Sequence, residues 1–302
     1  MASGDRSVSV VIPTMALLER RQSLLKAVNC IASQEGVHAI PVVVVNGNRF
    51  DEQLNEELRG DARIRYLYCN EPSAPEAQLV GRRAVSTPYF AFLDDDDELL
   101  PGALLRRIEA LEKYPEAAFA VENGYRHQRG QDEAVIDDME QLNDRPPLES
   151  LLETNWMASC SGLFRTVSVG EQFFQNPAPY MEWTYLAFRL SLVFEARFLS
   201  SFGYRINVTE NSVSSSESYL EGVVDVLTRM LEFDIPHGIA KTLRQKRVAA
   251  LHNLSVRHLD QGDLRRAWRY HLRSVASLEG LRYLGYSRQF FLPSRLGVDA
   301  DR

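Results

Sequence analysis

Four consecutive aspartates, residues 94–97, directly follow the apolar segment YFAFL at 89–93. Carboxylates this close together repel one another unless a cation lies between them. If the strand geometry of the apolar segment continues, Asp94 and Asp96 share one face and Asp95 points away from it. Hard carboxylate oxygens favour Mg²⁺ or Mn²⁺ over zinc or copper, and such an ion usually keeps positions open for substrate phosphates. The acidic run therefore predicts a divalent-metal site with Asp94 and Asp96 as ligands.

A second interpretation of the acidic run needs no ligand. Acidic residues next to a helix start interact favourably with the helix dipole, at about 0.3–1 kcal/mol per charge. A helix is expected to begin near Pro101, which would account for Asp97 and Glu98 but not for acids that start where the strand ends. The chain has no GxGxxG and no GxxxxGK(S/T) motif, so neither a dinucleotide-binding loop nor a P-loop supplies a phosphate site. A metal on the aspartates is expected to fill that role, as it does where a diphosphate is the leaving group.

Alternating strand and helix patterns over the first hundred residues would position these acids. Short apolar or β-branched segments predict buried strands at 8–12, 40–45, 64–68 and 89–93. Helix patterns follow the strands at 24–32, 51–59, 77–85 and from 101 onward. Strands joined by crossover helices imply an α/β fold with a doubly wound, mainly parallel sheet. Ligands bind beyond the carboxyl ends of the strands in such sheets, which is where the aspartates lie.

The sequence changes character after residue 121. The polar segment 126–147 is predicted to be rich in loops, whereas 182–194 predicts a buried helix and 196–208 a strand. Beyond the polar segment 211–218 the pattern is helical to about residue 280, and Gly262-Asp263 indicates a helix end followed by an N-cap. We therefore expect two domains, an α/β domain at 1–216 and a C-terminal α-helical extension at 217–302.

The composition is that of an ordinary globular protein, with 302 residues, 45% hydrophobic residues and a net charge of −7. This charge argues against a nucleic-acid partner. Three cysteines, Cys30, Cys69 and Cys160, lie far apart without a CxxC motif, which favours a reducing, cytoplasmic compartment without disulfides or a zinc cage. The first residues lack a signal-peptide pattern, and no apolar run approaches the roughly 20 residues of a membrane span.

Several segments together resemble the family 2 glycosyltransferases of the GT-A fold, whose catalytic domain has a Rossmann-like sheet. They are VSVVIPT, VVVVNGN, RIRYLY, YFAFLDDDDELLPGALLRRIEAL and YRINVTENSVSSS, and they span about residues 7–216. The resemblance implies transfer of a sugar from a nucleotide-diphosphate-sugar donor to an acceptor hydroxyl, with inversion and with Mg²⁺ or Mn²⁺. The family's Asp-x-Asp motif matches Asp94, Asp95 and Asp96. It implies that Asp94 contacts the donor's ribose or the metal, that Asp95 belongs to the donor site, and that Asp96 holds the metal on the diphosphate.

The resemblance implies further nucleotide-binding residues. Pro13 and Thr14 would line the nucleoside pocket. Asn46 stands where the family usually has Asp, and Gln78 lies in the place of its Ala-Arg-Asn segment, while Gly81 and Arg83 fit the family pattern. Both changes fall where the base is usually read, so specificity for UDP does not follow. The alternative for Asn46 is a simple turn residue within NGN.

Glu182 is the predicted catalytic base. The family has a Glu-Asp pair opening the helix that ends in Arg-Leu, and here Glu182 is followed by Trp183. A carboxylate within hydrogen-bond reach of the acceptor hydroxyl would take its proton. The alternative for Glu182 is an acid near a helix start, without catalysis. Trp156 and Trp183 are candidates for an acceptor-stacking platform, with core packing as the favoured alternative. Thr209 stands where the family often has a metal- or diphosphate-binding histidine.

Two rival functions follow from the same residues. A nucleotidyltransferase would also use a metal and a diphosphate, but it usually needs a Gly-rich basic loop, and IPTMALLERR has Arg20 and Arg21 without glycine. A non-catalytic nucleotide- or sugar-binding protein is supported by the departures at Asn46, Gln78, Trp183 and Thr209.

Residues 241–295 contain twelve Lys or Arg and three Asp or Glu, in an otherwise acidic chain. Enzymes of the family often act on glycan, lipid-linked or cell-envelope acceptors. The basic extension therefore predicts weak contact with the inner face of a membrane. The favoured alternative is a packed helical hairpin, whose apolar stripe (Leu251, Leu254, Leu264, Trp268, Leu272 and Val275) could also form a dimer.

Overall fold

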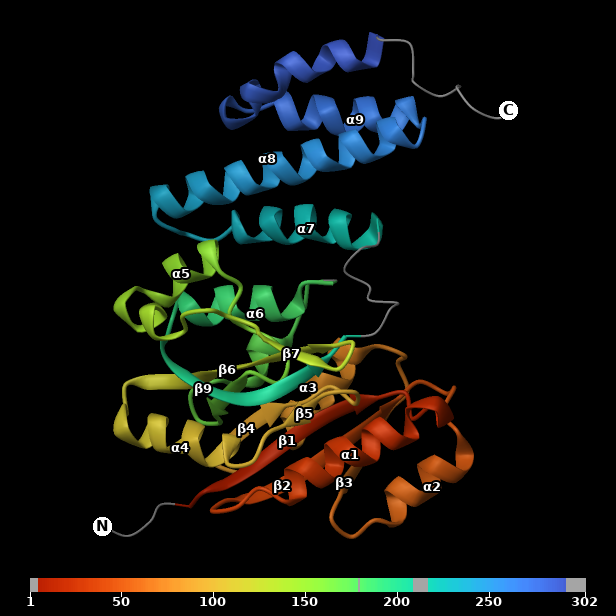
Figure 1. Ribbon diagram of the computed structural model, residues 1–302, viewed down its shortest axis with the longest axis vertical. Helices are drawn as coiled ribbons and strands as arrows, with labels where there is room; N and C mark the ends of the chain where they lie inside the picture. The colour runs from red at the N-terminus through yellow and green to blue at the C-terminus, as the bar shows by residue number, and fades with distance from the viewer. Residues whose placement is uncertain (1–4, 179, 209–216, 292–302) are drawn as a thin grey trace. The chain divides into compact units, whose positions relative to one another are not determined.

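Four parallel strands form one side of the sheet in the computed structural model, in the order β3-β2-β1-β4 (Figure 1). They are β1 (Ser7–Thr14), β2 (His38–Asn46), β3 (Arg65–Cys69) and β4 (Tyr89–Phe92). All four were predicted, and most apolar residues of β1, β2 and β4 are buried because helices cover both faces of the sheet, whereas the edge strand β3 is partly exposed. The chain runs outward from β1 to β3 and then crosses to β4 on the other side of β1. This reversal places a topological switch point between the carboxyl ends of β1 and β4.

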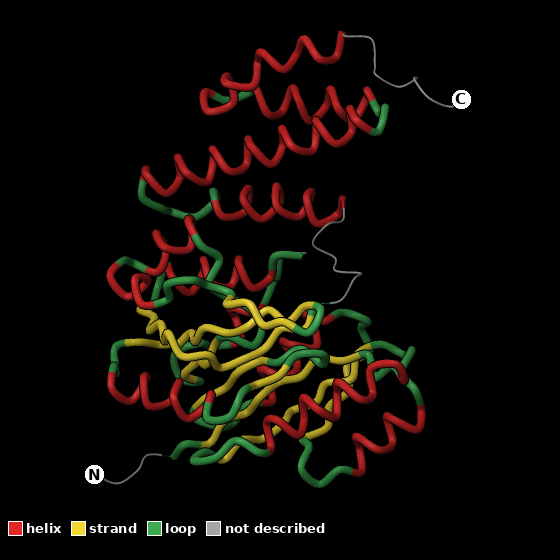
Figure 2. The backbone as a smooth tube through the Cα atoms, in the orientation of Figure 1, coloured by secondary structure: helices red, strands yellow, loops and turns green. Residues whose placement is uncertain are grey.

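Helices lie on both faces of this parallel half, as the doubly wound pattern predicted (Figure 2). The core on one face joins Val8, Val10 and Ile12 of β1 to α1 (Arg21–Ala32), α2 (Glu52–Gly60) and α4 (Ala103–Lys113). The other face meets α3 (Ala74–Ala84). A Cβ atom on Gly81 of α3 would lie 2.3 Å from a methyl carbon of Val11, so the helix approaches this closely only because residue 81 has no side chain.

The second side of the sheet corrects the prediction for residues 126–147. The sheet continues from β4 in the order β8-β6-β9-β5, with β8 (Gly162–Arg165), β6 (Ala117–Gln128), β9 (Glu195–Asn207) and β5 (Glu98–Leu99). Strand β6 includes the first three residues of the polar segment, 126–128, and turns at Arg129-Gly130 into β7 (Gln131–Ala134). Its last residues alternate between partly buried and exposed, so the sequence there lacks the apolar run that predicts a buried strand. Backbone pairing with β7 and with the distant β9 keeps these residues in a strand.

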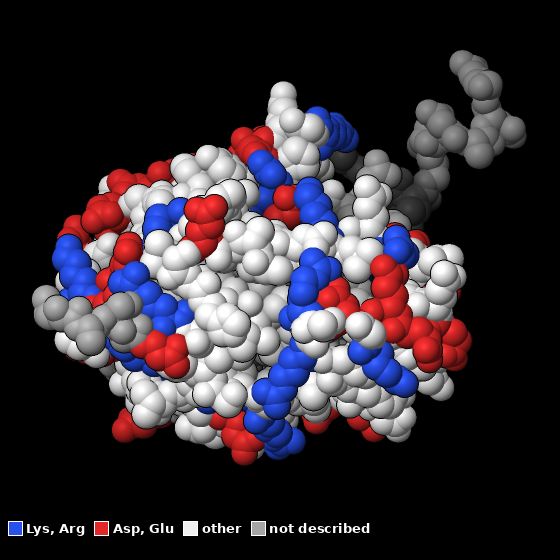
Figure 3. Space-filling view, turned by 90° about the horizontal axis from the view of Figure 1, so that it is seen from below, with Lys and Arg blue, Asp and Glu red and all other residues white. Residues whose placement is uncertain are grey.

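The structure describes residues 5–178, 180–208 and 217–291, and the chain divides into two compact units. The first unit comprises Met1–Pro177 and Glu182–Asn211, and the second comprises Ala178–Met181 and Ser212–Arg302. The predicted domain boundary falls at the end of segment 209–216, which lies outside the described residues. The remaining elements of the first unit are η1 (Leu18–Arg20), η2 (Glu140–Asp144), α5 (Pro147–Glu153), η3 (Glu171–Phe174) and α6 (Glu182–Ser191). Acidic and basic side chains are interspersed on the face shown in Figure 3.

The second unit contains α7 (Glu217–Met230), α8 (His237–Asp260), α9 (Leu264–Val275) and the 3₁₀ helix η5 (Leu278–Phe291). The predicted helix end and N-cap are confirmed, since Gly262 has φ +80° and the Asp263 carboxylate accepts a hydrogen bond from the Arg266 amide at 3.0 Å. The predicted apolar stripe is divided: Leu251 and Leu254 are buried, while Leu264 and Leu272 are more than half exposed. Among the residues that the structure describes, no helix has the length and apolar character needed to cross a membrane.

Candidate active site

The four aspartates form a turn at the switch point of the sheet, and we refer to residues 94–97 as the acid turn. Strand β4 ends at Phe92, and the Asp97 amide donates to the Asp94 carbonyl at 3.1 Å. Because the chain has already left the strand, the alternation that would turn Asp95 away from Asp94 and Asp96 does not apply here. The acid turn instead distributes its carboxylates among three surrounding segments.

Asp95 and Asp96 share a guanidinium from the end of η1. Arg20 Nη1 lies 2.5 Å from Asp95 Oδ1 and 3.0 Å from Asp96 Oδ2. The other Asp95 oxygen accepts a hydrogen bond from Thr14 Oγ1 at 2.6 Å, which ties the acid turn to the carboxyl end of β1. Asp95 is buried, whereas the Asp96 side chain is 28% exposed and is therefore the carboxylate open to a ligand.

Asp97 is buried and Asp94 is half-buried, on other sides of the acid turn. Ser159 Oγ donates to Asp94 Oδ2 at 2.8 Å, and the Asn207 amide donates to Asp97 Oδ1 at 3.1 Å. Burial raises the pKa of Asp94 to about 7; the Ser159 hydrogen bond opposes this rise, and the charges of Asp96, Asp95 and Glu182 add to it. Burial also raises the pKa of Asp97 to about 8, with further contributions from Asp94 and Asp96. The surroundings of the acid turn therefore supply too little positive charge to keep all four carboxylates ionised.

The acid turn fits a divalent cation. Its donors are carboxylate oxygens, as Mg²⁺ and Mn²⁺ prefer, and a positive group of the chain itself already lies against Asp96. Among the described residues no three His, Cys, Asp or Glu side chains are arranged to enclose a metal ion. An ion held by Asp94 and Asp96 would thus take its remaining ligands from diphosphate and water, as Mg²⁺ commonly does.

The predicted nucleoside-binding residues lie at neighbouring strand ends, with one exception. Thr14 ends β1 and Asn46 ends β2, and both are buried. Asn46 Oδ1 has no hydrogen-bond partner among the described residues, although a buried polar atom normally has one. Pro13 precedes Thr14 and pairs with Val44 in the parallel ladder. Arg83 is the exception, because it is exposed and binds Glu171 at 2.6 Å, with no described contact to the acid turn.

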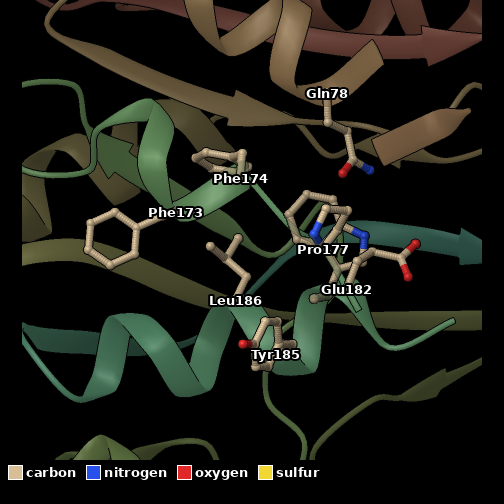
Figure 4. Close-up of a pocket in the computed structure, with 8 residues that line it drawn as sticks. Gln78, Phe173, Phe174, Pro177, Glu182, Tyr185 and Leu186 are labelled. Atoms are coloured by element: carbon tan, nitrogen blue, oxygen red, sulfur yellow. The ribbon is translucent and has the colours of Figure 1, made fainter. Parts of the chain in front are cut away.

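Gln78 and Glu182 line one small pocket (Figure 4). Gln78 comes from α3 and Glu182 from the first position of α6, and Phe173 and Phe174 of η3 contribute aromatic walls. Trp183 also lines the pocket and packs edge-on against Phe92, with ring centroids 5.2 Å apart. The departure from a second acid at position 183 has therefore placed an aromatic ring between the sheet and the pocket.

Trp156 has a different environment from Trp183. It is 1% exposed, stacks on Phe119 and donates its Nε1–H to Ser150 Oγ at 3.2 Å. These contacts make Trp156 a core residue, as the favoured alternative for it predicted.

The environment of Glu182 suits a general base. Burial raises its pKa above the ordinary glutamate value. Its charge also contributes to the raised pKa of Asp94, which shows that the α6 carboxylate and the acid turn are electrostatic neighbours. A raised pKa strengthens a carboxylate as a proton acceptor. The carboxylates of the acid turn and of Glu182 thus lie in one region of the first unit.

Sequence reasoning missed three partners of the acid turn: Arg20, Ser159 and Asn207. Arg20 was considered only as part of a basic loop, and the sequence separation of 75 residues from Asp95 gave no indication of their contact. Ser159 and Asn207 are also distant in sequence, at separations of 65 and 110 residues from their partners. Thr209, the other residue considered at this end of the domain, lies outside the described residues.

Comparisons with known proteins agree with this geometry. The family model described as Glycosyl transferase family 2 matches residues 9–169, which is just over half of the chain. A curated relative, the teichoic acid poly(glycerol phosphate) polymerase of Staphylococcus epidermidis, is 26% identical over 171 residues. These residues make up 52% of this chain and 23% of that protein, so the chain matches about a quarter of its relative's length.

Solved structures of S. aureus TarS share the fold. TarS 1–349 in complex with UDP-GlcNAc superposes with a TM-score of 0.58 at 15% identity, over 94% of this chain and 88% of that one. The complex of TarS 1–349 with UDP gives 0.57 at 15% identity, over 97% and 94%. The structural likeness supports a GT-A architecture, and the match of the family model establishes the assignment: the chain belongs to glycosyl transferase family 2.

Proposed function

We propose that the protein is an inverting, metal-dependent glycosyltransferase that uses a nucleotide-diphosphate-sugar donor. The observation that carries the proposal is the nearness of Glu182 to the acid turn, because the charge of Glu182 contributes to the raised pKa of Asp94. The TarS structures support a donor of this class, because one holds UDP-GlcNAc and another holds UDP. Family membership also argues against the nucleotidyltransferase alternative.

The residues at the strand ends would bind the donor. The unpartnered Asn46 oxygen is an acceptor that a base N–H can satisfy, and Thr14 and Pro13 would line the nucleoside side of the site. Gln78 is buried at the pocket beside Glu182 and can donate or accept a hydrogen bond. Asp94 and Asp96 would hold a Mg²⁺ or Mn²⁺ ion, which supplies positive charge to the diphosphate as it leaves.

Glu182 would accept the proton during transfer. The acceptor oxygen forms a bond to the anomeric carbon while the bond from that carbon to the diphosphate oxygen breaks. The electron pair of the broken bond leaves with the nucleoside diphosphate, and the acceptor's hydroxyl proton passes to the Glu182 carboxylate. Attack from the face opposite the diphosphate inverts the anomeric configuration, so we assign Glu182 to the acceptor side and the acid turn to the leaving-group side.

We further propose a glycan, lipid-linked or cell-envelope acceptor. The support is the sequence match to an enzyme of teichoic acid synthesis. An acceptor of this kind would place the enzyme in the cytoplasm near the inner face of the membrane. The basic extension at 217–302 would then contribute weak surface contact or dimerisation, and the domain at 1–216 would carry the catalytic site.

The donor can be identified by thermal shift with UDP-, GDP-, dTDP- and CMP-sugars, each with and without Mn²⁺. We expect one nucleotide class to stabilise the protein, and to do so more strongly with the metal, because a ligand bound only to the folded state raises its stability. The Asp96→Asn variant serves as the control for metal dependence. A shift of the same size with and without Mn²⁺ would contradict the metal seat.

The Glu182→Gln variant tests the catalytic role. It keeps the size and polarity of the side chain but cannot accept the proton, so transfer should fall by about 10²–10⁴ while donor affinity stays nearly the same. Transfer within a few-fold of the wild type would remove Glu182 from the mechanism. If the wild type binds the donor but transfers its sugar to no acceptor and to no water molecule, the non-catalytic binding protein is the correct alternative.

A further inference from the structure

The acid turn already contains a cation supplied by the chain. Arg20 Nη1 lies 3.0 Å from Asp96 Oδ2, the carboxylate that we assign to the metal. A divalent ion bound to that carboxylate would face a guanidinium at close range. Two positive charges at such a distance repel each other. In this arrangement the free protein should therefore have a low affinity for a divalent ion at Asp96, the position where the ion would contact the donor's diphosphate.

The two ion pairs of Arg20 differ in length and in burial. The contact with Asp95 is short, at 2.5 Å, and its carboxylate is buried and held from the other side by Thr14. The contact with Asp96 is longer, and that carboxylate is partly exposed. Exposed ion pairs contribute little to stability, whereas breaking a buried pair is costly. The Asp96 contact is therefore the one that a ligand can replace.

The Arg20 side chain can also reach solvent, since it is 39% exposed. A guanidinium presents five N–H donors in a planar fork, which matches the oxygens of a phosphate. With Asp95 engaging one edge of the fork, the remaining donors are available to a diphosphate that arrives at the acid turn. A diphosphate would also bring the negative charge that offsets a guanidinium and a divalent ion together.

We infer that Arg20 is a placeholder cation, which occupies Asp96 in the free enzyme and transfers that contact to the donor's diphosphate when the donor binds. This inference rests on the proposed function. Arg20 is then a positioning residue: it keeps its anchor on Asp95, releases Asp96 to the metal, and makes tight metal binding depend on the presence of the donor.

The test compares Mn²⁺ binding by nucleotide-free protein, measured by electron paramagnetic resonance of the free ion, in the wild type and in Arg20→Gln. The variant removes the positive charge but keeps hydrogen-bonding capacity, so we expect it to bind Mn²⁺ at least about five- to ten-fold more tightly than the wild type. In buffer with EDTA, its affinity for UDP should instead be lower by about ten-fold, because a charge-assisted hydrogen bond to phosphate is lost.

The chain offers matched controls. Arg21 is the next residue, and its guanidinium binds Glu57 at 2.8 Å on an exposed part of α1 and α2, so Arg21→Gln should change neither affinity. Arg20→Lys retains a cation and should leave Mn²⁺ binding as weak as in the wild type. Thermal denaturation confirms that each variant is folded before titration.

The outcomes separate this inference from the proposed function. If the wild type binds Mn²⁺ in the presence of UDP, but Arg20→Gln binds Mn²⁺ alone no better than the wild type, the placeholder role is wrong and the metal seat stands. If neither protein binds Mn²⁺ with or without UDP, the metal seat itself is wrong and the placeholder role with it. Tighter Mn²⁺ binding by both Arg20→Gln and Arg21→Gln would also overturn the inference, because it would reflect overall charge.

Discussion

Buried carboxylates in the first unit are neutralised in two opposite ways. Glu122 of β6 is fully buried and accepts hydrogen bonds from Arg106 Nε at 2.6 Å, from Arg107 Nε at 3.0 Å and from Ser201 Oγ at 2.6 Å. Two guanidinium groups thus surround one carboxylate. In the acid turn, four carboxylates lie together and one guanidinium, that of Arg20, pairs with two of them, Asp95 and Asp96. The pKa values of the other two, Asp94 and Asp97, are raised.

The difference distinguishes a structural cluster from a binding site. A buried charge is costly unless it is paired, and the Glu122 cluster obtains its counter-charges from the folded chain itself. The acid turn keeps an excess of negative charge, which a cation from outside would neutralise. Carboxylates without enough counter-charge from the chain indicate a site for a positively charged ligand. Carboxylates that the chain itself neutralises indicate a structural role.

Breaking the Glu122 cluster should have the largest effect on stability. Glu122→Gln leaves two arginines without their anionic partner, and Arg107 is itself fully buried, so the free energy of unfolding should fall by about 3–5 kcal/mol. Chemical denaturation measures this change. The control is Glu116→Gln, which removes an exposed partner of Arg197 and should cost less than about 1 kcal/mol. Equal effects of the two variants would remove the basis of the comparison.

Neutralising one acid of the acid turn should weaken ligand binding without weakening the fold. Asp96→Asn removes a metal ligand, so the affinity for donor with Mn²⁺ should fall by at least about 10–100-fold, measured by isothermal titration. The free energy of unfolding should stay the same or rise slightly, because one of several mutually repelling charges is gone. A loss of stability as large as that of Glu122→Gln would show that the acid turn is structural.

The pH dependence of turnover reports on the charge at Glu182. The carboxylate must be ionised to accept a proton, and burial raises its pKa, so protonation removes the base at a higher pH than for an ordinary glutamate. The kcat/KM should therefore fall as the pH is lowered, by about ten-fold per unit below that pKa, with the midpoint above 4.5. Glu182→Gln should abolish this acidic limb. A limb that persists in the variant belongs to another group.

The second unit shows the opposite imbalance, an excess of positive charge. Several exposed arginines of α9 and η5 form no ion pair with a described residue: Arg265, Arg269, Arg273, Arg282 and Arg288. They lie in the same elements as exposed leucines, including Leu272 and Leu278. By the reasoning applied to the acid turn, this surface fits an anionic partner, and each cation near an anionic bilayer contributes up to about 1 kcal/mol.

Vesicle sedimentation should show the smallest of these effects. We expect weak binding to anionic vesicles at low salt that disappears at high salt, since exposed charges are screened. Changing Arg269 and Arg273 to Gln should reduce the binding. The control is Arg244→Gln, because Arg244 is already paired with Glu279 at 3.0 Å. If anionic vesicles bind none of these proteins at low salt, the arginines have no role in membrane binding and are simply solvated surface residues.

The parallel half of the sheet was predictable because its signals are local. Each strand is a short β-branched or apolar segment next to its own helix, so no distant residue is needed to recognise it. The polar end of β6 was missed because its partners, β7 and β9, determine its conformation, and β9 lies about 70 residues later in the sequence. Propensity alone does not predict a strand that is exposed on one face.

The candidate site was predictable by residue type but not by pairing. The acidic run could be identified from residue type and order, and Glu182 was predicted from the resemblance to the family. The pairings depend on how distant segments meet, so they could not be predicted. Arg20 pairs with Asp95 and Asp96, and Ser159 binds Asp94. Arg83 binds Glu171 instead of the donor site. The strand alternation expected for residues 94–97 also failed, because the strand ended two residues before Asp94.

The hydrogen bond from the Asn207 amide to Asp97 has a consequence for how the protein is made. A ribosome releases the chain from the N-terminus, so the acid turn emerges more than a hundred residues before the strand that fixes it. Until β9 has been synthesised, Asp97 lacks that hydrogen bond. The proposed base, Glu182, is synthesised only shortly before β9. A nascent chain that ends at residue 169, the limit of the family match, would already contain the whole acid turn, yet it would have neither. Under the proposed function, donor binding would therefore become possible only late in synthesis, once β9 has been made.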